Sequence, residues 1–150
     1  MNKKEFITKL KVRLSNFIID EFKNYGFETT STAAQWIKDI VDWYANIVIN
    51  TREFRQYDDE DELDLSQMQY DILGEICTND TNIYGFITWP NNLACKKIVR
   101  KSYKNDSNFC EQYNKNLFNH IETDYFNYIW ENYLNENIYK CCAKFIEEFI

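Results

Sequence analysis

Glycine, proline and histidine are scarce in this chain of 150 residues, which contains three glycines, one proline and one histidine. Few glycines and prolines argue against a disordered chain and against a sheet protein rich in turns, and apolar residues make up 45% of the total. No uninterrupted apolar run approaches the roughly 20 residues that cross a bilayer. We therefore expect one helical domain over residues 1–150, without a contact to the membrane.

The cysteine pattern indicates reduced thiols. The chain has five cysteines, an odd number, and none of them forms a C-x-x-C pair. The N-terminal segment lacks the apolar core of a signal peptide. We expect a protein located in the cytoplasm of a bacterial host or an infected cell. Amino acids with AT-rich codons (Asn, Ile, Lys, Tyr, Phe) are abundant, which indicates a low-GC source.

Apolar residues recur at steps of three and four in several segments, the spacing that places them on one face of a helix. Residues 2–25 show such a stripe and end before Gly26, a residue suited to a helix C-cap. A second helix is expected over residues 32–54. A third should begin at Ser66, because Ser66 and Gln69 have the spacing of a capping box.

The second half of the chain predicts three more helices. They are expected over residues 92–104, 106–121 and 126–149, and the last has the longest apolar stripe of the chain. Between them, residues 79–92 contain a glycine and a proline and form an aromatic loop with at most one short extended segment. The prediction is an all-α fold, a compact single-domain bundle of about six helices with the long C-terminal helix as its spine.

Charge is segregated along the chain, whose formal net charge is −7. Residues 28–80 contain thirteen acidic and three basic residues, whereas residues 81–105 contain five basic and no acidic ones. Six of the acids fall within residues 58–64. A surface without a specific contact usually mixes charges of both signs, so this segregation favours a charged partner.

We predict that the acidic stretch is a surface for a basic partner protein. Carboxylates spaced along a surface imitate backbone phosphates and speed the encounter with a basic site. Two acids of the second predicted helix would extend this surface. The predicted partner-binding residues are Asp58, Asp59, Glu60, Asp61, Glu62, Asp64, Asp39 and Asp42.

The helix predicted over residues 92–104 offers an alternative site of opposite charge. Its basic face could bind nucleic acid or another anionic ligand, face only solvent, or pair with the acidic stretch. Direct nucleic-acid binding is disfavoured by the net acidic charge, because affinity for a polyanion depends largely on released counterions. The residues of this basic patch are Lys96, Lys97, Arg100, Lys101 and Lys104.

The aromatic loop contains Tyr84, Phe86 and Trp89. Aromatic residues are enriched in binding hot spots, so these three are possible partner contacts. They could equally close one end of the helical bundle, because large aromatic side chains are often buried.

No motif supports catalysis, a cofactor or a bound metal. The acidic stretch fails as an EF-hand loop, because counting from Asp58 places Leu63 where a glycine is needed and Gln69 where a glutamate is needed. His120 has only Asp124 as a carboxylate at helical spacing, which supports no metal site. Neither a glycine-rich phosphate loop nor a G-x-S-x-G motif occurs. We expect a protein that is not an enzyme.

In general character the chain is similar to the anti-CRISPR and antirestriction proteins of phages, which are small, acidic and without a catalytic motif. This likeness is one of composition and assigns no residue. It implies a non-catalytic inhibitor of phage or plasmid origin that blocks a basic, nucleic-acid-handling host protein. The alternative is an immunity-type or antitoxin-like protein that neutralises a basic toxin by the same forces. The sequence leaves the oligomeric state open.

Overall fold

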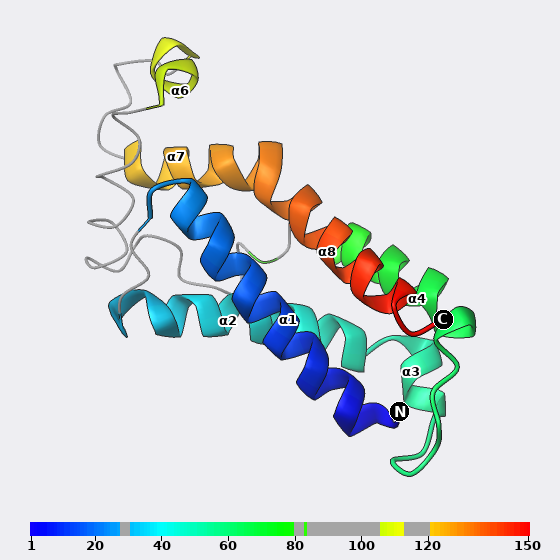
Figure 1. The fold of residues 1–150 in the computed structure, drawn as a ribbon. Coiled ribbons are helices and arrows are strands. Elements are labelled where there is room, and N and C mark those ends of the chain that lie inside the picture. The colour runs from blue at the N-terminus through cyan, green and yellow to red at the C-terminus, as the bar shows by residue number, and fades with distance from the viewer. Residues whose placement is uncertain (28–30, 80–82, 84–105, 113–120) are drawn as a thin grey trace.

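The computed structural model of the chain describes residues 1–27, 31–79, 83, 106–112 and 121–150. These residues form helices joined by turns and loops, with no strand among them (Figure 1), so the predicted all-α fold is confirmed. No helix in this part of the chain has the length and apolar content that crossing a bilayer requires. In chain order the elements are α1 (Lys3–Asn24), α2 (Ser31–Ile49), α3 (Arg52–Gln56), α4 (Leu65–Asn79), α6 (Ser107–Gln112), α7 (Ile121–Ile129), the π-helix η3 (Trp130–Leu134) and α8 (Asn135–Glu147).

Four helices, α1, α2, α4 and α8, form a ring in which each packs against two of the others. Two long-range contacts fix the direction of α8. Arg13 of α1 pairs with Glu148 at 2.6 Å, and Asn137 Nδ2 donates to Glu21 Oε2 at 3.4 Å. The end of α8 therefore lies beside the first half of α1, and its start lies beside the end of α1. The two helices run antiparallel, as Figure 1 shows.

α1 follows directly from its local sequence. Asn2 Oδ1 accepts a hydrogen bond from Glu5 N at 3.0 Å and caps the start of the helix. At the other end Gly26 adopts a φ of 76°, and Phe27 N donates to Phe22 O at 2.7 Å, a pattern typical of a Schellman C-cap. The predicted glycine cap is confirmed. The buried stripe consists of Phe6, Leu10, Leu14, Ile18 and Phe22.

α2 ends earlier than predicted. It stops at Ile49 and does not continue to Phe54, because Thr51 has extended backbone angles (φ −66°, ψ 147°). Thr51 is buried, and its Oγ1 donates to Val48 O at 2.8 Å. The break allows α3 to turn Phe54 into the core, where its ring lies 6.2 Å from that of Phe6. Tertiary packing therefore outweighs the local helical pattern at this point.

The long C-terminal helix is confirmed, but the π-helix η3 divides it. In Figure 1 the chain changes direction there, between α7 and α8. Trp130, Leu134, Ile138 and Cys142 are all buried at steps of four residues. In an ideal α-helix each such step rotates the side chain by ~40°, because a turn takes 3.6 residues. The wider π-helical turn offsets part of that drift and keeps the stripe toward the core.

Aromatic side chains fill the core where α1, α2 and α7 meet. The ring of Phe126 lies 4.7 Å from Trp36, 6.4 Å from Phe22 and 6.3 Å from Trp130. Phe22 is near the end of α1, about 30 Å along the helix axis from Met1. This aromatic cluster therefore lies far from the acidic stretch, which packs beside the N-terminus.

Several predicted elements fall partly or wholly outside the described residues. The helix expected over 92–104 lies outside them, and so does the aromatic loop apart from Asn79, which ends α4, and Ile83, which is buried. Of the helix expected over 106–121, α6 is described, and Asp106 Oδ1 caps it by accepting from Phe109 N at 2.9 Å.

Candidate functional site

The predicted acidic surface falls on the loop that joins α3 to α4, here called the acidic loop (residues 57–64). It lies beside the N-terminus at one end of the bundle (Figure 1). All six acidic residues of this loop are exposed, whereas Leu63 between them is buried. The loop therefore presents its charges to solvent while one apolar side chain fixes it to the core.

Hydrogen bonds give the acidic loop a defined backbone. Asp58 N donates to Asp61 Oδ2 at 2.9 Å, and Asp61 N donates to Asp58 O at 3.0 Å, which closes a turn over residues 58–61. Leu63 N donates to Met1 O at 2.9 Å. We call residues 58–61 the acidic turn. Its carboxylates extend from a backbone that is tied at its own ends and to the start of α1.

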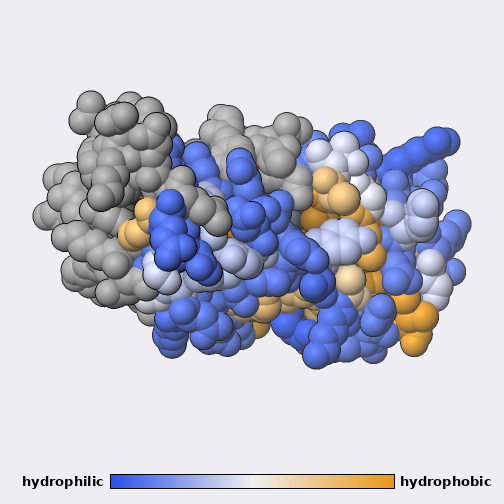
Figure 2. Space-filling model, turned by 90° about the horizontal axis from the view of Figure 1, so that it is seen from above, coloured by the Kyte–Doolittle hydropathy of each residue, from blue (hydrophilic) through white to orange (hydrophobic). Residues whose placement is uncertain are grey.

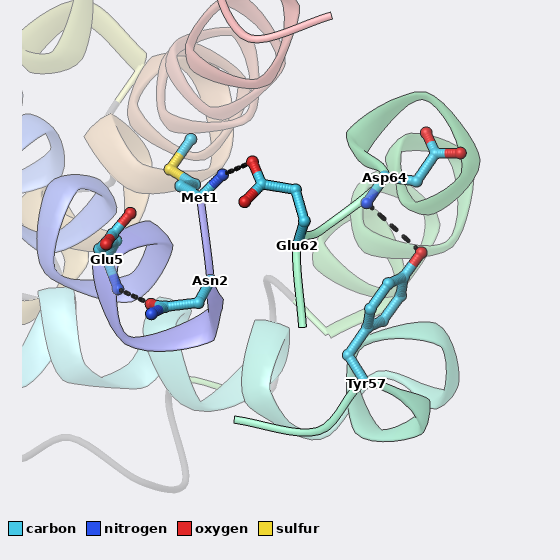
Figure 3. Close-up of polar contacts among 6 residues, drawn as sticks. All are labelled: Met1, Asn2, Glu5, Tyr57, Glu62 and Asp64. Atoms are coloured by element: carbon cyan, nitrogen blue, oxygen red, sulfur yellow. Dashed lines mark hydrogen bonds and ion pairs between the residues drawn. The ribbon is translucent and has the colours of Figure 1, made fainter. Parts of the chain in front are cut away.

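Two further contacts, drawn in Figure 3, hold the C-terminal half of the loop. The carboxylate of Glu62 pairs with the N-terminal ammonium of Met1. The hydroxyl of Tyr57 accepts a hydrogen bond from Asp64 N at 3.4 Å. Glu62 therefore joins the loop to the N-terminus, and Tyr57 ties the first residue of the loop to its last, directly before α4.

Asp64 is the N-cap of α4. Its Oδ1 accepts a hydrogen bond from Gln67 N at 3.3 Å, and Met68 N donates to Asp64 O at 3.2 Å, which closes the first turn. The predicted capping box at Ser66 and Gln69 is therefore displaced by two residues. An aspartate is at least as good a cap as a serine, and its charge also favours the positive end of the helix dipole.

The six acids of the loop thus fall into two groups. Glu62 and Asp64 have partners that stabilise the loop and α4. The four acids of the acidic turn are exposed, and no lysine or arginine of the described residues forms an ion pair with them. Their charge is therefore available to a partner.

A shallow groove of about 750 Å³ separates the acidic turn from the start of α1. Lys3, Lys4 and Arg55 line this groove together with Asp59 and Glu60, without forming ion pairs with them. The field of these cations weakens the negative potential on the groove side of the turn. A basic partner is therefore best placed on the opposite, solvent-facing side.

The two predicted site residues of α2 have internal partners. Asp42 lies 3.1 Å from Lys38 Nζ and 3.3 Å from Lys11 Nζ. Partial burial acts to raise the pKa of Asp42, but hydrogen bonds from Lys38 and Lys11 outweigh it and hold the pKa below its ordinary value. Asp39 accepts a hydrogen bond from Gln35 Nε2 at 2.8 Å. A partner contact by these two carboxylates stays a prediction.

The other predicted contacts lie outside the described residues. For this reason the basic patch, the aromatic contacts and a pairing between the basic patch and the acidic loop all stay predictions. The residues concerned are Lys96, Lys97, Arg100, Lys101, Lys104, Tyr84, Phe86 and Trp89.

Metal binding and cysteine chemistry have little support among the described residues. No three His, Cys, Asp or Glu side chains of this part of the chain converge in a way that could hold a metal ion. Cys142 is buried and Cys141 is half-buried, and burial raises the pKa of both thiols above the ordinary value. Because the thiolate is the reactive form, neither cysteine is activated as a nucleophile.

The sequence did not predict a second groove, which lies between α4 and α8. It has a volume of about 580 Å³ and is lined in part by Tyr70, Gly74 and Tyr139. Two signals in α4 point to it in retrospect. Tyr70 lies off the stripe of buried residues, and a glycine stands inside a helical pattern, where it weakens the helix. No local sequence pattern in α8 indicates that Tyr139 lines this groove.

The chain matches no protein-family model, and no curated protein or solved structure shows significant similarity to it. Its function has to be inferred from the geometry of its own residues.

Proposed function

We propose that the protein is a non-catalytic inhibitor that binds a basic protein through its acidic loop. The observation that supports this proposal is the acidic turn, whose four exposed carboxylates have no lysine or arginine partner among the described residues. The turn is held by one backbone hydrogen bond and by one from Asp58 N to the Asp61 carboxylate, so binding would cost little ordering of the chain. Its negative field would attract a basic surface and raise the association rate.

The partner is a nucleic-acid-handling protein of the host cell. A groove that holds a nucleic-acid backbone presents lysine and arginine side chains to phosphates, and exposed carboxylates can occupy the same positions. Inhibition by occupation of such a groove needs no catalytic group. The likeness in composition to anti-CRISPR and antirestriction proteins supports an origin in a phage or plasmid and action in the cytoplasm.

A basic toxin is a second class of partner that the same acidic surface would fit. In that case the protein would act as an immunity-type protein or antitoxin. The forces are identical in the two cases, and identification of the partner distinguishes them.

The experiment is affinity capture from a lysate of a low-GC bacterium with three C-terminally tagged baits. The first is the wild-type protein, and the second has the acidic turn neutralised (Asp58→Asn, Asp59→Asn, Glu60→Gln, Asp61→Asn). The third is a matched control in which four other exposed acids are neutralised, Asp20→Asn, Glu111→Gln, Glu131→Gln and Glu147→Gln. Both variants have the same net charge, so only the position of the lost charge differs.

We expect the wild-type and control baits to capture the same basic protein, as identified by mass spectrometry, and the turn variant to lose it. Equal capture by all three baits would show that the acidic turn is not the binding surface. Equal loss with both variants would show that overall charge, and not this loop, drives the interaction.

A further inference from the structure

The groove between α4 and α8 differs from the rest of the surface in its lack of charge. No Asp, Glu, Lys, Arg or His lines it, although charged residues make up 27% of the chain. In the part of Figure 2 where α4 and α8 lie, hydrophobic and intermediate atoms reach the surface among hydrophilic ones. The lining residues are Ser66, Gln69, Tyr70, Leu73, Gly74, Cys77 and Tyr139.

Tyr70 is the most exposed aromatic residue in the described part of the chain, with 92% of its surface accessible. Beside it, Leu73 and Tyr139 are partly buried and pack against the hydrophobic core. The groove therefore has a firm apolar floor and an aromatic side chain at its rim. Tyrosine is enriched among residues that dominate binding energy, because it offers a large contact area with few rotatable bonds.

Gly74 lines the groove from an exposed position inside α4. A glycine there destabilises a helix by about 1 kcal/mol relative to alanine. Gly74 does not have the left-handed backbone conformation that favours glycine, which among the described glycines only Gly26 adopts. A Cβ at Gly74 would have no described heavy atom within 4 Å apart from its chain neighbours and the nearby backbone of α4. Neither backbone conformation nor packing of the described residues therefore requires a glycine. A glycine at this exposed position lets another molecule approach the helix backbone closely.

We propose that this groove receives an α-helix of the basic partner, an inference that rests on the proposed function and defines how the partner is held. α4 begins directly after the acidic loop, and Gly74 lies ten residues beyond Asp64, about 15 Å along the helix axis. A helix of the partner that lies along α4 can therefore place an apolar side chain over Gly74. The lysines or arginines of the same helix, two to three turns away, would then face the acidic turn.

The net charge of the chain favours a basic helix over a second copy of the chain as the occupant of the groove. Each copy has a net charge of −7, so two copies repel each other electrostatically. A basic helix instead gains electrostatic attraction at one end of the groove and buries apolar surface at the other.

The test uses three labelled synthetic helical peptides of equal length and fluorescence anisotropy at low and high salt. The first peptide has a leucine stripe and a cluster of lysines at one end. The second keeps the lysines and has glutamine in place of leucine, and the third keeps the leucines and has glutamate in place of lysine. We expect only the first peptide to bind the wild-type protein tightly, because it alone matches both the α4–α8 groove and the acidic turn.

The groove is tested with Gly74→Leu, which fills it, and with Asn46→Leu, which adds the same side chain at an exposed position of α2. We expect Gly74→Leu to weaken binding of the first peptide by at least about tenfold at both salt concentrations, a loss of about 1.4 kcal/mol. Asn46→Leu should bind the first peptide as the wild type does.

Tyr70→Ala, at an exposed position, should also weaken binding of the first peptide. Thermal unfolding should show Gly74→Leu at least as stable as the wild type, since leucine is the better helix former.

Unchanged affinity of both Gly74→Leu and Tyr70→Ala would overturn the groove inference, and so would failure of the first peptide to bind the wild type. A dimer in sedimentation that Gly74→Leu abolishes would also overturn it, in favour of a second copy. The proposed function fails by a different result, in which neutralising the acidic turn leaves the affinity and its salt dependence unchanged while Gly74→Leu still abolishes binding.

Discussion

Asp42 of α2 and the four acids of the acidic turn have different surroundings. Asp42 lies between Lys38 and Lys11, which hold its pKa below the ordinary value against the effect of partial burial. The acidic turn has four exposed carboxylates and no such partner among the described residues. Within the predicted acidic surface, Asp42 thus forms ion pairs and the acidic turn does not. The acidic turn therefore offers more of its charge to a basic protein, on the side away from Lys3, Lys4 and Arg55.

Asp42 and the acidic turn are also held in place by different contacts. Asp42 is held by its own ion pairs, and such exposed pairs contribute up to about 1 kcal/mol. The acidic turn is held at its edges, by the buried side chain of Leu63 and by Asp64 at the start of α4. The Asp61 carboxylate accepts a hydrogen bond from Asp58 N and helps to close the turn, but the four charges repel one another. Changes at its edges should therefore affect stability more than changes at the charges themselves.

Leu63→Ala should have the largest effect on stability. The side chain is 8% exposed and belongs to the hydrophobic core, so its truncation should lower the free energy of unfolding by about 2 kcal/mol. Urea unfolding measures this loss. Hydrogen exchange at the Leu63 amide, which donates to Met1 O, should also become faster. A loss below about 0.5 kcal/mol would show that this side chain does not anchor the acidic loop.

Asp64→Ala should have the next largest effect. It removes the N-cap of α4 and should cost about 1 kcal/mol, whereas Asp64→Asn keeps an acceptor for Gln67 N and should cost only a few tenths. Chemical denaturation of the two variants and of Ser66→Ala gives the comparison. A larger loss for Ser66→Ala than for Asp64→Ala would place the cap where the sequence predicted it.

Asp42→Asn should have a smaller effect, with a defined dependence on pH. The ion pairs are largely exposed, so the loss near neutral pH should be about 0.5 kcal/mol. Because the folded-state pKa of Asp42 is lower than its ordinary value of 3.8, its contribution is present above that value and is lost as the pH falls through the lowered pKa. Urea unfolding should therefore show the wild type and the variant converging as the pH falls below 3.8 and through the lowered pKa. A difference that persists in acid would rule out the ion pairs as its cause.

Neutralising the acidic turn should change stability least. The combined variant Asp58→Asn, Asp59→Asn, Glu60→Gln and Asp61→Asn should unfold within about 0.5 kcal/mol of the wild type, because these side chains are exposed and repel one another. The Asp61→Asn change retains a side-chain oxygen that can accept from Asp58 N. Thermal unfolding measures the change. A loss of several kcal/mol would mean that the turn is a structural element and not a free binding surface.

The parts of the fold that depend on local sequence were predictable. The stripe of α1 and its end at Gly26 follow from periodicity and from the backbone freedom of glycine. The break after Ile49 was not predictable, because it is fixed by the packing of Phe54 against α1. The π-helix η3 is likewise set by the register of the stripe in the core, which no local pattern shows.

In the candidate site, too, only the features that depend on local sequence were predictable. The sequence located the acidic stretch and a helix start just after it. The sequence placed the cap at Ser66, because Ser66 and Gln69 have the spacing of a capping box. The hydroxyl of Tyr57, which accepts from Asp64 N, is a contact made only in the folded chain. The α4–α8 groove also needs Tyr139, far along the sequence, to lie beside α4.

The association rate with the captured partner, measured against ionic strength, tests the central claim most directly. The wild type and the control with four acids neutralised elsewhere should associate fast at low salt and slow down steeply as salt rises. The variant with the neutralised acidic turn should associate about tenfold more slowly at low salt and depend little on salt. Equal rates and equal salt dependence for the wild type and the turn variant would contradict the assignment of the acidic turn as the binding surface.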